Sequence, residues 1–388
     1  MKSRVLLAVA FLAFVSLGLP DTLLGIAWPF VREHFGLPHP FMGFVLIVTS
    51  FGYFISSSGV AGLMRRMPIG VLLAYSSGLV ALGEFGFALS PAWIIFIGSG
   101  VLHGLGSGAI DAGLNHFAAV RFSARQINWL HASYSLGATA GPAIMTTAIV
   151  AAGSWRTGYG IVGGLLAALA FLFFATSSRW SESPTVNSEA SSATAATAID
   201  WKSALASPQA RLQIALFFFY AGIEVGVGQW SFTLLTASRG LSVADAGSWV
   251  TLYWASIFGG RVVSGFVVER IGIDRLLRIC FCTLIAGAIL LALPALGWIS
   301  LCALPMIGLS LAPVYPCLMS RTPSRVGVAT SAHTVGFQVS AAMIGASALP
   351  TLIGLLAGSY GLEIVGVAIA GFSVVVFVIH EALLRPPR

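Results

Sequence analysis

Long apolar stretches, separated by short polar ones, run through almost the whole chain. A helix needs about 20 mostly apolar residues to cross a bilayer. The first stretch follows Lys2 and Arg4 as in a signal peptide, but it continues through Trp28 without a clear cleavage pattern. We therefore predict an all-α membrane protein with twelve transmembrane helices, near residues 4–31, 41–64, 68–90, 93–120, 127–150, 157–178, 210–237, 244–269, 275–295, 299–320, 327–356 and 362–383.

One polar segment interrupts this pattern near the middle of the chain. Residues 179–209 are rich in Ser, Thr and Ala and cannot bury a core, so they predict a flexible cytoplasmic linker. It separates six predicted helices in 1–178 from six in 210–388. The halves also echo one another at a shift of about 200 residues, with Asp21 opposite Glu224. This pattern predicts two pseudo-symmetric six-helix bundles, as in large secondary transporters.

Composition supports a membrane protein. The 388 residues are 57% hydrophobic and 9% charged, whereas soluble domains carry about 25% charged residues. The net charge of +7 lies at helix ends, which favours a topological origin over a nucleic-acid partner. With both termini in the cytoplasm, every Lys and Arg except Arg32, Arg156 and Arg239 falls on the inner side. We expect a multi-pass protein of the cell membrane, here a bacterial inner membrane, that functions as a monomer.

Several classes of chemistry lack the residues that they need. The four cysteines lie in apolar segments and suggest neither a disulfide framework nor a zinc site. The two lysines, Lys2 and Lys202, fit neither a phosphate-binding loop nor a retinal Schiff base. We find no cluster of nucleophile and base or of metal ligands. The sequence therefore predicts no cofactor, no metal and no enzymatic activity.

A stripe of small residues organises one predicted helix. Gly100, Gly104 and Gly108 recur every four residues and share one helix face. Small residues at this spacing let membrane helices approach closely. Asp111 and Asn115 continue the stripe, so we expect them on the close-packed or cavity side, away from lipid.

Acidic residues inside predicted spans are the candidates for proton coupling. A mid-membrane acid costs about 2.5–3.5 kcal/mol and usually marks a functional pathway. Asp21, Asp111 and Glu224 are assigned to this role, with a structural role as the alternative; for Glu84 we favour the structural role. We place no Lys or Arg in the mid-membrane region, so these acids are expected to lack a basic partner and to exchange protons. Pro20 should loosen the helix beside Asp21.

Amide, histidine and aromatic side chains in the helices form the candidate substrate site. Amides can bind hydroxyl groups and aromatic rings can stack on a ligand, a combination that suits a neutral polyol such as a sugar. The alternatives are hydrogen-bonded structural histidines and aromatic residues that pack or anchor at the interface. The candidates are Asp21, Trp28, Asn115, Asn128, His131, Gln229, Trp230, Tyr253, Tyr315 and Gln338.

A loop motif and three helical stretches resemble a known family. Residues 265–275, GFVVERIGIDR, match the pattern G-x-x-x-[D/E]-R-x-G-x-x-R and resemble a loop signature of the major facilitator superfamily. The first copy, AGLMRRMPIG, departs from it because Arg65 replaces the acid. GLPDTLLGIAWP, GLGSGAIDAGLN and NWLHASYSLGATAGP resemble its fucose-permease-like branch of fucose, glucose and galactose:proton symporters. The resemblance implies a cytoplasmic gate formed by Arg65, Arg66, Glu269, Arg270 and Arg275.

The same resemblance implies that one acid in helix 1 and one in helix 4 carry proton coupling and sugar recognition. These are Asp21 and Asp111, the latter standing where the sugar symporters have a glutamate. We thus expect a secondary active transporter of a small neutral polar solute, a sugar, working by proton-coupled alternating access. Its partners would be a sugar-like small molecule, protons and the lipid bilayer. Proton-coupled efflux of amphipathic compounds and a non-transporting membrane sensor remain the alternatives.

Overall fold

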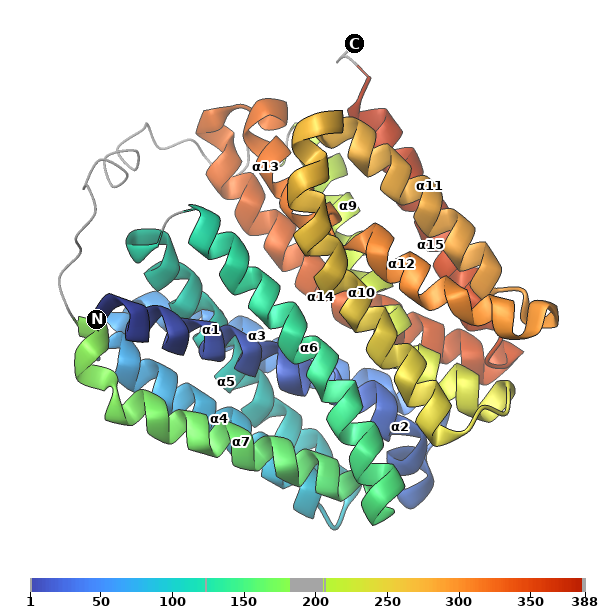
Figure 1. Cartoon of the computed structure of the whole chain (residues 1–388), viewed down its shortest axis with the longest axis horizontal. Coiled ribbons are helices and arrows are strands. Elements are labelled where there is room, and N and C mark those ends of the chain that lie inside the picture. The colour runs from blue at the N-terminus through green and yellow to red at the C-terminus, as the bar shows by residue number, and fades with distance from the viewer. Residues whose placement is uncertain (1, 123, 182–204, 206, 386–388) are drawn as a thin grey trace. The chain divides into compact units, whose positions relative to one another are not determined.

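The computed structural model describes residues 2–122, 124–181, 205 and 207–385, and every regular element within them is helical (Figure 1). Short 3-10 and π turns join or extend the α-helices. The α-helices are α1 Lys2–Asp21, α2 Leu23–His34, α3 Met42–Met64, α4 Ile69–Leu89, α5 Trp93–Arg121, α6 Ala124–Ala152, α7 Trp155–Ala175, α9 Pro208–Thr233, α10 Val243–Ile271, α11 Ile273–Leu291, α12 Ala303–Leu311, α13 Val314–Val326, α14 Val328–Tyr360 and α15 Ile364–Leu383.

Eleven helical segments of the described chain are long and apolar enough to span a membrane. Some of them combine neighbouring helices: α1 and α2 form one span, and α12 and α13 form another. Helix α11 is 19 residues long and begins with the charged residues Asp274, Arg275 and Arg278, which keeps its apolar part short. With α11 counted, these helices account for the twelve that the sequence predicts, and the all-α membrane fold is confirmed.

The chain divides into two compact units. Counting described residues only, unit 1 consists of Met1–Val186 with Gly240–Trp254, and unit 2 of Asn187–Arg239 with Ala255–Arg388. The first part of α10 therefore groups with unit 1. The predicted linker 179–209 lies mostly outside the described residues, so the division into bundles 1–178 and 210–388 stays a prediction.

Close helix pairs in unit 1 depend on glycine. Helices α3 and α5 pack together, as do α1 and α6, and α4 packs on both α5 and α7 (Figure 1). A Cβ atom at Gly104 would lie 2.0 Å from the carbonyl oxygen of Thr49 on α3, and one at Gly108 would lie 2.3 Å from that of Tyr53. No side chain fits at such separations. The glycine stripe faces α3, and the predicted close approach is confirmed.

The first span breaks where Pro20 predicts it. Helix α1 ends at Asp21 and α2 begins at Leu23, with Thr22 between them. The Thr22 hydroxyl donates a hydrogen bond to the carbonyl oxygen of Ala138 on α6, at 3.1 Å. This contact ties the break to a neighbouring helix. It leaves Asp21 at an interruption of the regular helix.

Unit 2 is built around α9, which packs on α14 and α15. A Cβ atom at Gly345 of α14 would lie 1.9 Å from the carbonyl oxygen of Phe218 on α9. The indole nitrogen of Trp230 donates to the carbonyl oxygen of Pro350 at 2.8 Å. A glycine contact and a buried hydrogen bond thus fix α9 against α14.

Candidate functional site

Asp21 lies at the helix break and is bound by side chains from two other helices. The hydroxyl of Tyr134 on α6 donates to Asp21 Oδ2 at 2.9 Å. On the other side, Nε2 of His103 on α5 lies 3.4 Å from Asp21 Oδ1. The Asp21 side chain nevertheless keeps 37% of its surface accessible. The carboxyl group is therefore positioned from both sides and still reachable.

His103 continues the network into the core of unit 1. Its Nδ1 lies 2.7 Å from Oε1 of Glu84 on α4, whose side chain is fully buried. The second oxygen of Glu84, Oε2, has no hydrogen-bond partner among the described residues. Asp21, His103 and Glu84 together form what we call the Asp21–His103–Glu84 chain, contributed by α1, α5 and α4.

Two members of this chain are not among the functional residues that the sequence predicts. The structural role predicted for Glu84 is not tested by this placement, and His103 is not among the predicted site residues. The signal available was a histidine inside an apolar span, directly before Gly104 of the glycine stripe. Ionisable groups inside spans usually face the protein interior and bind one another. That rule, applied to His103, would have marked it as a partner for an acid.

Asp111 of α5 forms a second cluster, on the side of its helix that faces α3. It accepts a hydrogen bond from the hydroxyl of Tyr53 on α3. Its other oxygen, Oδ1, accepts one from Nδ2 of Asn115 at 2.8 Å. Asp111 thus lies on the α3-facing side of α5, as the glycine stripe predicts, and Asn115 binds to it from one turn later. Neither the proton-coupling role of Asp111 nor the substrate role of Asn115 is tested by this placement.

The third predicted acid has a basic group in its surroundings. Glu224 accepts a hydrogen bond from the hydroxyl of Tyr220, one turn earlier on α9. Arg261 of α10 also lies within hydrogen-bonding reach of Tyr220, inside the span Val243–Ile271. Glu224 and Tyr220 thus have a basic side chain in their surroundings, whereas the expectation that no arginine lies in the mid-membrane region stays a prediction. A tyrosine and a glutamate of another helix make this position tolerable for a guanidinium group, which the α10 sequence alone does not reveal.

Several predicted substrate-binding side chains are buried in packing contacts. Trp28 is fully buried, with its ring 6.2 Å from that of Trp93. Trp230 is also fully buried, with its nitrogen bound to Pro350. Gln338 is buried and donates from Nε2 to Thr322 Oγ1 at 3.0 Å and to Gln213 Oε1 at 3.3 Å, in unit 2.

The others are placed differently. His131 is exposed, and its ring lies 5.3 Å from that of Phe14. Tyr315 is half-buried, with its ring 6.4 Å from that of Tyr220. Gln229 and Tyr253 are buried, and the side chain of Asn128 lies outside the described residues. Tyr315 thus lies near Tyr220, which binds Glu224. The substrate-binding roles of all the candidate residues stay predictions.

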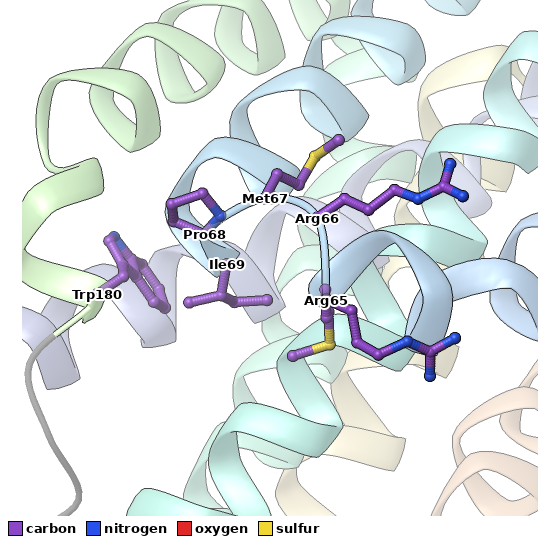
Figure 2. A pocket seen from close by; sticks show the side chains of 7 residues that line it. Arg65, Arg66, Met67, Pro68, Ile69 and Trp180 are labelled. Atoms are coloured by element: carbon purple, nitrogen blue, oxygen red, sulfur yellow. The ribbon is translucent and has the colours of Figure 1, made fainter.

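The predicted gate residues lie at helix ends. Arg65 and Arg66 are exposed at the turn between α3 and α4, where they border a shallow pocket of about 410 Å³. In Figure 2 both guanidinium groups extend away from Trp180 on the other side of this pocket. The pocket is lined by Met64, Arg65, Arg66, Met67, Pro68, Ile69 and Trp180, and so contains none of the acids described above.

In unit 2 the described ion pairs of the loop motif at residues 265–275 are formed by Asp274 and not by Glu269. Glu269, Arg270 and Arg275 are exposed. Asp274 pairs with Arg321 and, at 3.1 Å, with Arg325, both on α13. The gate role of the five predicted residues stays a prediction. Among the residues that the structure describes, no group of three His, Cys, Asp or Glu side chains is arranged to hold a metal ion.

Comparisons with known proteins agree with this architecture. The family model of the Major Facilitator Superfamily matches residues 9–348. The human sodium-dependent glucose transporter 1 is 25% identical over 153 residues, which cover 38% of this chain and only 29% of that protein. A D-xylose-proton symporter has the same fold, with a TM-score of 0.79 at 12% identity over 99% of this chain and 98% of that one. FucP in an outward conformation gives 0.63 at 17% identity over the full length of both chains.

Proposed function

Because the chain belongs to the Major Facilitator Superfamily, we propose that it carries a small neutral polar solute of the sugar class together with protons. Family membership makes it a multi-pass membrane transporter, and the prediction of a transporter rather than an enzyme is confirmed. The sugar substrate and the coupling to protons are the two features of transport that we propose. Transport would proceed by alternating access between two six-helix bundles.

The observation that carries the proposal is the environment of Asp21. A carboxyl group inside a spanning segment, at a helix break, is accessible and yet held by Tyr134 and His103. Such a group can accept a proton from water and change its hydrogen bonds when it does so. Ionisable residues in spans are usual markers of proton and substrate pathways. Asp111, bound to Tyr53, offers a second carboxyl group in the same unit.

Two further considerations support a neutral, hydroxyl-rich substrate. The hydroxyl and amide groups around the two acids, those of Tyr134, Tyr53 and Asn115, are the kind that bind sugar hydroxyls. The named relatives and structural neighbours include a glucose transporter, a D-xylose-proton symporter and FucP. Asp21 is proposed to bind both substrate and proton, whereas Asp111 and Glu224 would contribute to proton coupling.

The proposal includes a membrane topology. The strong bias of Lys and Arg toward one side supports two cytoplasmic termini in a bacterial inner membrane. Arg65, Arg66, Glu269, Arg270 and Arg275 would then lie at the cytoplasmic face as a gate. We propose a functional monomer, since each unit contains its own cluster of acidic and tyrosine side chains.

The test is uptake into liposomes containing the purified protein. Radiolabelled D-glucose, D-galactose, L-fucose and D-xylose would be offered with and without a pH gradient, alongside counterflow without a gradient. We expect at least one sugar to accumulate only with the gradient. Asp21→Asn should abolish accumulation and weaken binding, while Glu33→Gln, which alters an exposed acid of α2, should behave as wild type. Gradient-independent sugar uptake would refute proton coupling; export of amphipathic dyes without sugar uptake would favour the efflux alternative.

A further inference from the structure

We propose that Glu84 and His103 extend the proton site from Asp21 into the core of unit 1, so that the transported proton is shared by all three groups. This inference rests on the proposed function in one respect, that the coupling ion is a proton. Under this proposal His103 is a positioning and proton-transferring residue, and Glu84 is the innermost acceptor.

The two links of the Asp21–His103–Glu84 chain differ in length. His103 Nδ1 and Glu84 Oε1 are 2.7 Å apart, which is a short hydrogen bond. His103 Nε2 and Asp21 Oδ1 are 3.4 Å apart, which is longer than the usual upper limit of about 3.2 Å for such a bond. The imidazole ring is thus held firmly by Glu84, with Phe87 beside it at 6.2 Å between ring centroids. Small movements at the helix break beside Asp21 can make or break the looser link.

Exposure falls along the same path. The side chains of Asp21, His103 and Glu84 are 37%, 7% and 0% accessible. A proton from water can therefore reach the chain at Asp21 and travel inward through the two nitrogen atoms of one imidazole ring. Histidine suits this step because one ring nitrogen can accept a proton while the other donates one.

The geometry at Glu84 favours a proton at the inner end. An ionised carboxylate there would bury a negative charge with Oε2 lacking any described partner. Burial of a charged group without full hydrogen bonding is far more costly than burial of a neutral one. In the neutral acid, one oxygen donates to His103 Nδ1 and the other is an uncharged carbonyl oxygen. Transfer of the proton from His103 Nδ1 to Glu84 itself removes most of this cost.

One complete transfer adds a single proton to the three groups. The chain begins with Asp21 and Glu84 ionised and with neutral His103 carrying its proton on Nδ1. A hydronium ion gives one proton to Asp21 Oδ1 and becomes water. That proton moves to His103 Nε2 while the Nδ1 proton moves to Glu84 Oε1. At the end Asp21 is again ionised, His103 is the other neutral tautomer and Glu84 is neutral, so the three groups together have gained one proton. Release of the proton reverses these steps.

Other titratable groups surround the chain and belong to its environment. The hydroxyl of Tyr134 on α6 donates to Asp21. Tyr159 on α7 interacts electrostatically with Glu84, and its hydroxyl is buried without a described hydrogen-bond partner. Asp111 lies close enough to Asp21 for the two carboxyl groups to interact. Protonation of one of these two acids should therefore disfavour protonation of the other, because it removes the negative charge that attracts the second proton.

The test is pH-difference infrared spectroscopy of the purified full-length protein, because the band of a protonated carboxylic acid reports the proton without any substrate. We expect a pH-dependent carboxyl band that disappears in Glu84→Gln. In His103→Gln its midpoint should move by about one pH unit or more, a tenfold change in proton affinity. The matched controls are Glu33→Gln and His116→Gln, an exposed histidine of the same helix α5, and both should titrate as wild type.

The outcomes separate this inference from the proposed function. A band that is unchanged in Glu84→Gln and lost only in Asp21→Asn would place the proton on Asp21 alone and overturn the inference, with proton-coupled transport intact. If Glu84→Gln fails to fold, an unmoved midpoint in His103→Gln would overturn it instead. If wild-type protein transports no sugar with protons, the proposed function fails, while the infrared result still decides whether the three groups share a proton.

Discussion

Gly104 offers the sharpest test of how closely α3 and α5 approach. In Gly104→Ala the new Cβ atom would lie 2.0 Å from the carbonyl oxygen of Thr49 and 3.0 Å from the backbone nitrogen of Tyr53. Both are backbone atoms and cannot rotate away. Ordinary contact begins near 3.4 Å, so α3 would have to withdraw by about 1.4 Å. Overpacking of this kind costs about 1–3 kcal/mol.

The matched control lies on the same helix. Gly98 is exposed, and a Cβ atom there would meet nothing within 4 Å. Gly98→Ala should therefore stabilise the protein by roughly 0.5–1 kcal/mol through its better helix propensity. The opposite signs of the two substitutions isolate the steric contact from the intrinsic preference of alanine for helix.

The assay is reversible unfolding of the purified protein in mixed detergent micelles, followed by helical circular dichroism, for both variants. Withdrawal of α3 should also separate Tyr53 from Asp111, so Gly104→Ala should reduce accumulation driven by a pH gradient. Tyr53→Phe removes this hydrogen bond without the steric clash, and separates the two effects. Equal unfolding free energies for Gly104→Ala and Gly98→Ala would refute the proposed tight packing of α3 on α5.

Three further predictions concern coupling, pH dependence and topology. Asp111→Asn should abolish gradient-driven accumulation in liposomes but retain counterflow; wild-type pH dependence in that variant would exclude Asp111 as a proton carrier. Glu363 lies between two spans, where burial raises its pKa but the hydrogen bonds and charge of Arg239 outweigh this and lower the pKa below its ordinary value of 4.5. The ionised Glu363 side chain should therefore stabilise the protein above about pH 4.5, and this stabilisation should be lost as the pH falls through the lower folded-state pKa. In that acidic range, thermal stability should fall more steeply in wild type than in Glu363→Gln. A cysteine introduced within residues 183–198 should resist impermeant reagents in intact cells, and extracellular labelling would contradict the cytoplasmic assignment.

The sequence alone determined the class of fold and much of its local geometry. Backbone polar groups in a bilayer must be satisfied within the protein, so long apolar stretches leave few alternatives to helices. Pro20 predicted the break at Asp21 because it removes a backbone donor. The spacing of Gly100, Gly104 and Gly108 predicted which face of α5 would pack closely, and therefore the direction of Asp111. Each of these inferences depends on neighbours in one helix.

Only the tertiary structure decided which polar groups meet. Glu84 and His103 are 19 residues apart in sequence, and Asp21 and His103 are 82 apart. No periodicity within one helix specifies the axial register of three packed helices, so the sequence alone could not show that Glu84 and Asp21 both contact His103. The proximity of Arg261 to Tyr220 likewise depends on how α9 and α10 pack, which the sequence of α10 alone does not reveal. The cost of a charge in a membrane depends on its partners, and helix packing supplies those partners from distant parts of the chain.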